Sequence, residues 1–189
     1  MNKLIITFIL LISLSCKIDK KQSPKVREIA KLEIPKISIP TVENNEKTIV
    51  DELYTFQFKI EKTKNDKHNL VINIKLHNGS YFISPNATRD FSGKFYMDLG
   101  SYKDLSFNGN IIETPRTVEE YDIHPFTNGL VNWVRVNTTY TQPLNIQSEN
   151  DFEVFGRVRF TIEPRCSLEE IPFAISYKNG VMILIDPKC

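Results

Sequence analysis

The sequence predicts an all-β fold, an antiparallel immunoglobulin-like β-sandwich of about eight or nine strands. Two observations carry this prediction. From Leu53 onward, several segments alternate apolar with polar residues, which is the period of a half-buried strand. Asn-Gly, Ser-Gly and Pro-Asn pairs separate these segments, and no long helical period occurs among them. We therefore expect one β domain over residues 51–189.

The clearest predicted strand covers residues 54–61, whose aromatic and aliphatic side chains all fall on one face. Residues 70–77 alternate in the same way after a polar turn, so we expect them to be its hairpin partner. No strand pattern is visible over residues 114–129. Further strands are expected at 80–84, 94–98, 105–112, 130–141, 152–162, 171–177 and 181–185.

The last strands allow closer predictions. Gly156 interrupts the apolar face of its strand, where a bulge or a close backbone approach would suit glycine. Asn179-Gly180 is a hairpin turn signal, and a two-residue turn places Lys178 opposite Val181. Residues 181–185 are unbroken apolar sequence, so we expect that strand to be buried on both faces.

The first sixteen residues have the layout of a secretory signal. Lys3 supplies the charged start, an apolar run covers residues 4–14, and small Ser15 precedes Cys16. The run of 11 residues is well short of the roughly 20 that a membrane-spanning helix requires. The layout therefore predicts export.

Leu14-Ser15-Cys16 resembles the end of a bacterial lipoprotein signal, although that family usually has Leu, Val or Ile where this chain has Ser13. The resemblance implies that residues 1–15 are a signal peptide and that Cys16 becomes the lipid-carrying first residue of the mature chain. It also implies a lipid-anchored protein of the bacterial cell envelope, facing the periplasm or the surface. The alternative is an ordinary signal peptide cut elsewhere, with Cys16 an incidental thiol.

Residues 16–50 are expected to form an extended tether, because they contain three prolines and no sustained period. Residues 17–36 carry a net charge of +4. Beside a lipid anchor such a segment would be attracted to anionic headgroups, although lysine-rich linkers also serve solubility alone. The mature chain is neutral overall, which argues against a nucleic-acid partner.

Cys166 and Cys189 are the remaining cysteines, and they are a plausible disulfide pair in an exported protein. Continuing the register of the final hairpin places Cys189 opposite Glu170, four residues from Cys166. The alternative is two free thiols, because disulfide geometry is demanding.

Glu120, Asp122 and His124 are weak candidates for a metal site. If their segment is extended, the three side chains project to one side, and two carboxylates with an imidazole can bind a divalent metal. The segment also reads as an acidic surface connection, and nothing supplies the supporting hydrogen bonds that metal ligands need. We therefore expect no metal and no cofactor.

Trp133 lies in an apolar strand. It would fill the core between two sheets or, alternatively, form a stacking platform for a carbohydrate.

The last third of the chain combines a strand containing Gly156, the segment Pro164-Arg165-Cys166, a short acidic loop, Pro172-Phe173 and a final hairpin. This combination resembles the immunoglobulin-like periplasmic domain of DsbD-type thiol:disulfide interchange proteins. That family places two redox cysteines close together on adjoining strands, for which this chain offers Cys166 and Cys189. The resemblance implies the fold more directly than the activity.

No Ser-centred elbow, glycine-rich phosphate loop or Cys-X-X-Cys motif occurs in the sequence. We therefore expect a non-enzymatic envelope lipoprotein whose β-sandwich binds or scaffolds another envelope component, a protein or a glycan. The alternative is a thiol-disulfide exchange domain that uses Cys166 and Cys189.

Overall fold

The structure, a computed structural model, describes residues 45–123 and 127–187. These residues form fourteen β-strands and no helix. The predicted signal peptide, the predicted lipidation site Cys16, most of the predicted tether, His124 and Cys189 lie outside the described residues. Within the described part, no helix is present that could span a membrane.

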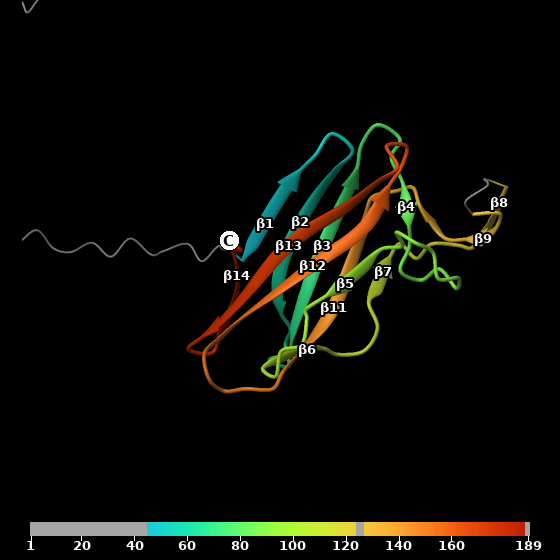
Figure 1. Cartoon of the computed structure of the whole chain (residues 1–189). Coiled ribbons are helices and arrows are strands. Elements are labelled where there is room, and N and C mark those ends of the chain that lie inside the picture. The colour runs from blue at the N-terminus through green and yellow to red at the C-terminus, as the bar shows by residue number, and fades with distance from the viewer. Residues whose placement is uncertain (1–44, 124–126, 188–189) are drawn as a thin grey trace, which may run out of the picture. The chain divides into compact units, whose positions relative to one another are not determined.

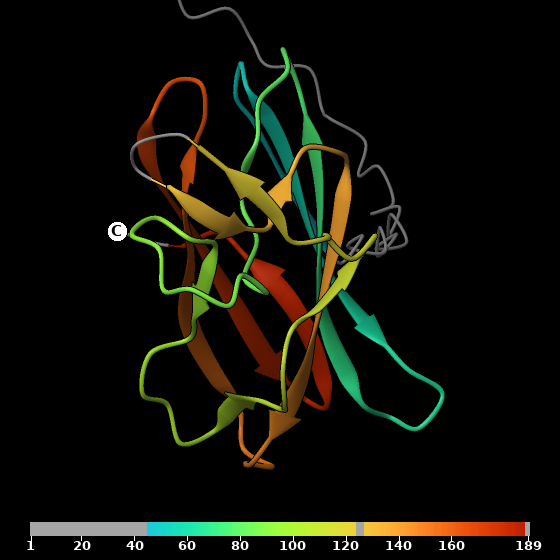
Figure 2. The ribbon, with the colours of Figure 1, turned by 90° about the vertical axis from the view of Figure 1, so that its right-hand side faces the viewer.

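Two antiparallel sheets face each other, as the two views of the ribbon show (Figures 1 and 2). The first sheet has the order β1-β2-β3-β11-β6, with β7 also pairing with β11. Its strands are β1 (Glu46–Val50), β2 (Tyr54–Lys62), β3 (His68–Leu76), β6 (Leu105–Phe107), β7 (Ile112–Thr114) and β11 (Thr138–Ile146). The second sheet has the order β14-β13-β12-β5 and consists of β5 (Tyr96–Asp98), β12 (Phe152–Ile162), β13 (Ser167–Lys178) and β14 (Val181–Ile185). This arrangement confirms the predicted immunoglobulin-like sandwich.

Two small sheets extend the domain at one end (Figure 1). One pairs β4 (Phe82–Ile83) with β10 (Trp133–Val134), and the other pairs β8 (Glu120–Asp122) with β9 (Gly129–Val131). The β8–β9 hairpin projects from the sandwich and leaves Tyr121 and Leu130 exposed on opposed strands.

The strongest sequence predictions are confirmed. β2 and β3 form the expected hairpin, with Phe56 opposite Ile74 and Ile60 opposite Leu70. Lys178 lies opposite Val181, as the Asn-Gly turn predicts. Gly156 belongs to a continuous β12–β13 ladder, so the alternative of a close approach is the correct one. A Cβ at this position would meet the ring of Phe173 and the carbonyl oxygen of Asp98.

The strand count is higher than expected. Residues 46–50, placed in the tether, form edge strand β1, and residues 120–122 form β8 inside the stretch that shows no strand pattern. The strand expected at 105–112 is divided into β6 and β7. Pro143 lies on β11 between the residues that pair with β7 and those that pair with β6. Because proline has no backbone N–H, this gap is where β11 tolerates it.

The core between the two sheets is rich in aromatic side chains. The ring of Phe56 stacks on that of Phe160 across the sheets, with centroids 5.1 Å apart. The ring of Phe95 stacks on that of Tyr140 at 4.4 Å, and both residues are buried. Trp133 lies outside this core and packs on a small second cluster formed by Ile83, Ala87 and Val131. The prediction that it fills the core between the sheets is therefore wrong.

The expectation that β14 is buried on both faces is also wrong. Met182 and Leu184 are buried, whereas Val181 is 43% exposed and the two isoleucines are only half-buried. Each sheet of this two-layer sandwich packs only one face on the core, and no described layer completely covers the outer face of β14.

The carboxylate of Glu113 on β7 is buried among hydrogen-bond donors. Its Oε1 accepts from the hydroxyls of Ser84 and Tyr140, each at 2.8 Å. Its Oε2 accepts from Asn86 Nδ2 at 2.9 Å and from the backbone N–H and hydroxyl of Thr117 at 3.0 and 2.9 Å. Burial raises the pKa of this carboxyl, but the hydrogen bonds outweigh burial and hold the pKa below its ordinary value. The network joins β7 and β11 to the segment that follows β4.

Glu113→Gln should lower the free energy of unfolding by about 3 kcal/mol near neutral pH. Both carboxylate oxygens of Glu113 accept hydrogen bonds, and in glutamine one of them is replaced by an NH₂ group that faces the same hydrogen-bond donors. Since the folded-state pKa is lowered, the stabilisation by the carboxylate is complete above its ordinary pKa of 4.5 and is lost as pH falls through the folded value. Urea unfolding of both proteins at a series of pH values measures this.

The wild type and the Glu113→Gln variant should therefore approach each other in stability in acid. Glu149→Gln, at an exposed loop position, is the matched control and should change stability by less than about 0.5 kcal/mol. A Glu113→Gln penalty that stays constant down to strongly acidic pH would contradict the role given to the carboxylate.

Candidate functional site

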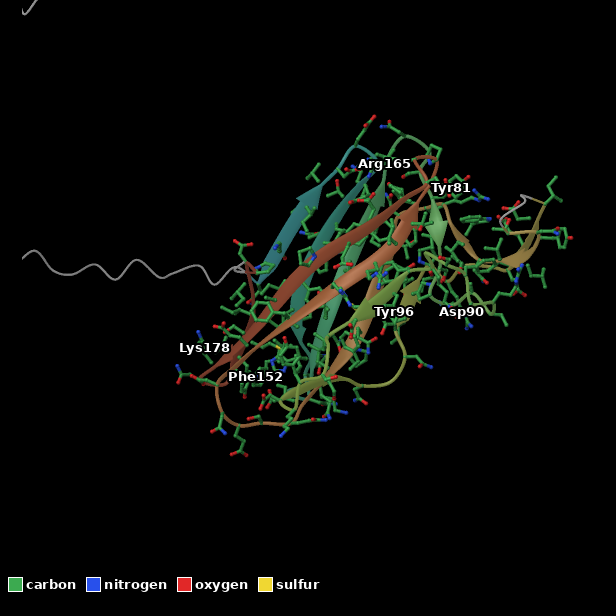
Figure 3. The ribbon with its side chains drawn as sticks, viewed as in Figure 1. Tyr81, Asp90, Tyr96, Phe152, Arg165 and Lys178 are labelled. Atoms are coloured by element: carbon green, nitrogen blue, oxygen red, sulfur yellow. The ribbon has the colours of Figure 1, made fainter. Side chains whose placement is uncertain are left out.

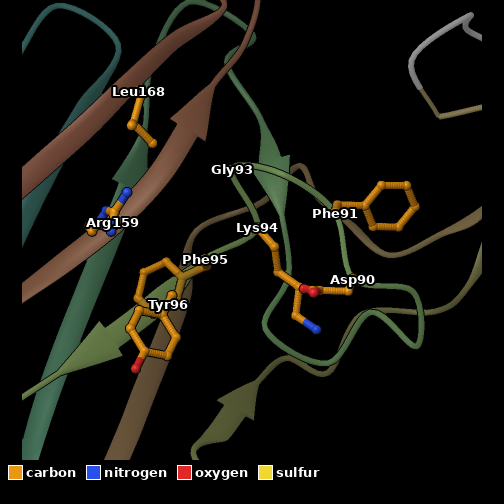
Figure 4. Close-up of a pocket in the computed structure, with 8 residues that line it drawn as sticks. All are labelled: Asp90, Phe91, Gly93, Lys94, Phe95, Tyr96, Arg159 and Leu168. Carbon is orange, nitrogen blue, oxygen red and sulfur yellow. The ribbon is translucent and has the colours of Figure 1, made fainter.

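Two adjoining cavities form a trough between the loop that precedes β5 and the outer surface of β12 and β13. Phe91 and Leu168 line both cavities and so join them. The smaller cavity, of about 220 Å³, is lined by Asp90, Phe91, Gly93, Lys94, Phe95, Tyr96, Arg159 and Leu168 (Figure 4). The larger, of about 360 Å³, is lined by Ile83, Phe91, Ser92, Thr127, Trp133, Thr161, Glu163, Cys166 and Leu168.

The trough lies at the end of the sandwich away from the β13–β14 turn. Figure 3 places Asp90 and Tyr96 on one side of the domain and Lys178 at the opposite end. In Figure 4, Arg159 and Leu168 rise from the strands on one side, while Phe91, Lys94 and Asp90 come from the loop on the other. The two walls therefore belong to segments far apart in the sequence.

Gly93 fastens the loop to the sheet. The Thr161 backbone N–H donates to the Gly93 carbonyl at 2.7 Å, and the Phe95 N–H donates to the Ile83 carbonyl at 2.9 Å. Gly93 has φ of +81°, and a Cβ there would collide with the side chain of Thr161. Only glycine lets the loop approach β12 this closely.

Arg89 connects the same loop to the β8–β9 side of the trough. Its Nη1 donates to the Thr127 carbonyl at 2.6 Å, and its guanidinium lies 4.7 Å from the centre of the Phe91 ring. Lys94 Nζ donates to the Ala87 carbonyl at 2.9 Å, which closes the loop on itself. These contacts hold Phe91 in place between the two cavities.

Trp133 is partly buried and lines the larger cavity. Its indole N–H donates to Asp122 Oδ2 at 2.8 Å, and its ring meets that of Tyr81 edge-on at 4.9 Å. The guanidinium of Arg135 lies over the indole at 5.4 Å and also pairs with Glu120 at 2.9 Å. Of the three weak metal candidates, two are therefore engaged in contacts with Trp133 and Arg135.

His124, the third metal candidate, lies outside the described residues, so the triad is not tested as a set. Among residues 45–123 and 127–187, no group of three His, Cys, Asp or Glu side chains is placed to hold a metal ion.

Cys166 is exposed and lines the larger cavity, with φ of +54°. It is a free thiol within the described part of the chain. Because Cys189 lies outside that part, the Cys166–Cys189 disulfide stays a prediction.

A polar network beside Cys166 joins the two sheets. Glu169 accepts hydrogen bonds from Tyr54 and Arg165, both at 2.9 Å, and Arg165 also pairs with Asp51 at 3.2 Å. Burial raises the pKa of Glu169, but hydrogen bonds from Ser167, Tyr54 and Arg165 hold it below its ordinary value. The network fixes the start of β13, which carries Leu168 on the trough wall.

The trough is lined by a small set of charged and reactive side chains. The cations are Lys94 and Arg159, the carboxylates are Asp90 and Glu163, and the remaining reactive group is the Cys166 thiol. No histidine among residues 45–123 and 127–187 lines either cavity.

The sequence analysis identified Trp133 and Cys166 as candidate functional residues. It did not identify Phe91 and Lys94 of the loop, or Arg159 of β12, as residues of a site. The Ser-Gly pair at 92–93 marked a turn, and the outward position of Arg159 followed from the alternation of its strand. Neither signal says that the loop folds back onto that strand. That contact depends on the close approach of Gly93 to Thr161.

No protein-family model matches the sequence, and no curated protein matches it. Similar solved structures include the N-terminal periplasmic domain of ScsB from Proteus mirabilis, at 8% identity, 68% coverage of this chain, 50% of that chain and a TM-score of 0.46. The chain thus spans about half the length of that structure. The GAE domain of GGA2p from Saccharomyces cerevisiae is 12% identical to this chain. The match covers 71% of this chain and 98% of that domain, with a TM-score of 0.38.

The N-terminal domain of DsbD from Neisseria meningitidis, in its reduced form, has 10% identity to this chain. The match covers 69% of this chain and 90% of that domain, with a TM-score of 0.36. At such scores the likeness to all three structures is general and carries no functional information.

Gly93→Ala should lower the free energy of unfolding by about 3 kcal/mol, because it combines a strained φ with a collision against Thr161. Gly79→Ala is the matched control, because Gly79 has φ of +69° but nothing near its Cβ position. It should cost only the backbone strain, about 1 kcal/mol. Urea unfolding, with hydrogen exchange of the Thr161 amide, measures both effects. Equal penalties, or a protected Thr161 amide in Gly93→Ala, would contradict the anchoring role of this glycine.

Proposed function

We propose that this chain is a bacterial envelope lipoprotein whose β-sandwich binds another envelope component at the trough, without catalysing a reaction. The observation that supports this most strongly is the trough itself. Its larger cavity lies within the usual range of ligand pockets, and apolar walls with a few polar groups are the usual lining of such pockets.

The exposed residues at the edge of the trough support binding rather than catalysis. The large apolar side chain of Leu168 is 57% exposed and stands between the two cavities. Exposed apolar groups beside charged ones are typical of recognition surfaces. The trough is also held by hydrogen bonds of Gly93 and Arg89, so a ligand would meet a largely formed site.

The anchor part of the proposal comes from the sequence. The layout of residues 1–16 supports lipid attachment at Cys16, and the proline-containing tether would hold the domain away from the membrane. A module that is tethered in this way searches the space near one membrane, which favours capture of a neighbour in the envelope.

Site-specific photo-crosslinking in intact envelopes tests the binding role. A photoreactive residue in place of Ser92, which is exposed at the larger cavity, should give a discrete crosslinked product. The same residue in place of Lys103, an exposed position away from the cavities, is the control and should give none. Trp133→Ala should diminish the Ser92 product. No product at position 92, or equal products at both positions, would contradict the proposal.

Metabolic labelling with a lipid precursor tests the anchor. The parent protein should incorporate label and sediment with membranes, and Cys16→Ala should do neither, because the acceptor thiol is absent. Cys166→Ser is the control and should behave as the parent. A Cys16→Ala protein that is labelled and fractionates like the parent would remove the lipoprotein part of the proposal.

A second candidate is thiol-disulfide exchange by Cys166 with Cys189, favoured by the exposure of Cys166 at the larger cavity. Its test is thiol counting by mass spectrometry and a redox titration of the purified oxidised domain. A structural disulfide should have a potential below about −300 mV, whereas an exchanging one should be more oxidising. We expect no exchange with a thioredoxin-like partner. A readily reduced pair that exchanges would favour this candidate over the binding module.

A further inference from the structure

We propose that the trough takes an extended peptide segment of a partner protein, with an apolar side chain in the larger cavity and a carboxylate against Arg159 in the smaller one. This inference rests on the proposed binding function and names its ligand.

Arg159 supplies the anion-binding end. Its side chain is 42% exposed, its buried Nε forms an ion pair with Glu170 Oε2 at 3.6 Å, and its guanidinium donates no hydrogen bond to any described residue. That distance is too long for a hydrogen bond. Because the Nε has no accessible surface, the exposed part of the guanidinium is the part that would donate charge-assisted hydrogen bonds to a ligand carboxylate.

The charge of the smaller cavity agrees with an anionic ligand. Two cations, Lys94 and Arg159, line it against one carboxylate, Asp90, while Glu170, outside the cavity, shares its carboxylate between Arg159 at 3.6 Å and Arg157 at 3.3 Å. The net positive balance favours a carboxylate over an ammonium group. The negative charge of Asp90 should repel the ligand carboxylate that Arg159 attracts. Removal of this charge should therefore strengthen binding.

The larger cavity supplies the apolar end. Ile83, Phe91, Trp133 and Leu168 line it, and Leu168 remains 57% exposed, so an apolar side chain that covers Leu168 would remove that surface from water. In an extended chain, alternate side chains point to the same side and are roughly 6.6 Å apart. Arg159 lines the smaller cavity and Thr161, two residues further along β12, lines the larger, so the two cavities suit residues i and i+2 of one strand-like segment.

The environment of Trp133 disfavours a glycan as the occupant. Stacking of a sugar needs an open ring face, whereas Arg135 already lies over the indole and Tyr81 meets it edge-on. Its N–H is also already donated to Asp122. The indole is thus better placed to form one wall of an apolar cavity than to serve as a platform.

Trp133 is the single tryptophan of the chain, so its indole N–H signal reports on the trough without ambiguity. The test is an NMR titration of the 15N-labelled protein with the peptide acetyl-Ser-Leu-Thr-Glu-Ser-amide. We expect saturable shifts of the indole signal and of the Arg159 Nε–H signal. Peptides with Ser in place of Leu, or Lys in place of Glu, should each bind at least about tenfold more weakly.

Protein variants test the same contact from the other side. Arg159→Gln should weaken binding about tenfold, whereas Arg157→Gln, on the same outer face but outside both cavities, should change it less than about twofold. Asp90→Asn should strengthen binding. The dispersion of the amide spectrum verifies the fold of each variant.

Three results would overturn the inference: no saturable shift, equal binding of the Lys-containing peptide, or equal losses in Arg159→Gln and Arg157→Gln. If these occur while the Ser92 crosslink still forms, only the ligand class is wrong. If the crosslink also fails, the proposed function is wrong as well.

Discussion

The hydrogen bond from the Tyr140 hydroxyl to the Glu113 carboxylate joins the apolar core of this domain to its polar end. The ring of Tyr140 stacks on Phe95 in the core, while its hydroxyl reaches the carboxylate at 2.8 Å. The same carboxylate holds Ser84 and Asn86, which begin the loop that ends at Phe95. The loop is therefore fixed at one end by charge-assisted hydrogen bonds and at the other by aromatic packing. If the carboxylate lost its charge, the loop wall of the trough would lose this support.

This arrangement explains how a domain whose described residues form only β-strands presents a hollow on the outer face of a sheet. A sheet by itself offers a flat face, and a hollow requires a segment folded over it. Here the loop is pressed against β12 through Gly93 and Thr161, and Arg89 ties it to Thr127. The hollow that results combines apolar walls with Arg159, whose partly exposed guanidinium pairs with Glu170 but donates no hydrogen bond to any described residue. Binding at this position would therefore cost little rearrangement of the protein.

Local pattern was enough to predict the sandwich. Alternation identified β2, β3 and β12, and the Asn-Gly turn set the register of the β13–β14 hairpin, because these features depend on neighbouring residues alone. Short strands were missed where tertiary contact decides them. β1 becomes a strand by pairing with β2, and β8 by pairing with β9. Trp133 was wrongly placed in the core because sequence cannot show which of several apolar clusters a side chain joins. The trough was beyond prediction for the same reason, since its walls come from residues about 70 positions apart, such as Phe91 and Arg159.

The most direct measurement of the central claim is the accessibility of the trough in its native setting. The thiol introduced by Leu168→Cys, in a chain that also carries Cys166→Ser and Cys189→Ser, can be labelled with a membrane-impermeant maleimide in the purified protein and in native envelopes. We expect rapid labelling of the purified protein and strong protection in envelopes, where an occupant would cover the trough. A thiol introduced by Glu153→Cys, at an exposed position near the other end of β12, should react equally fast in both. The labelling rate at position 168 is compared with the rate at position 153. If position 168 reacts as fast in envelopes as in the purified protein, the trough is not occupied in the envelope and the proposed binding role is contradicted.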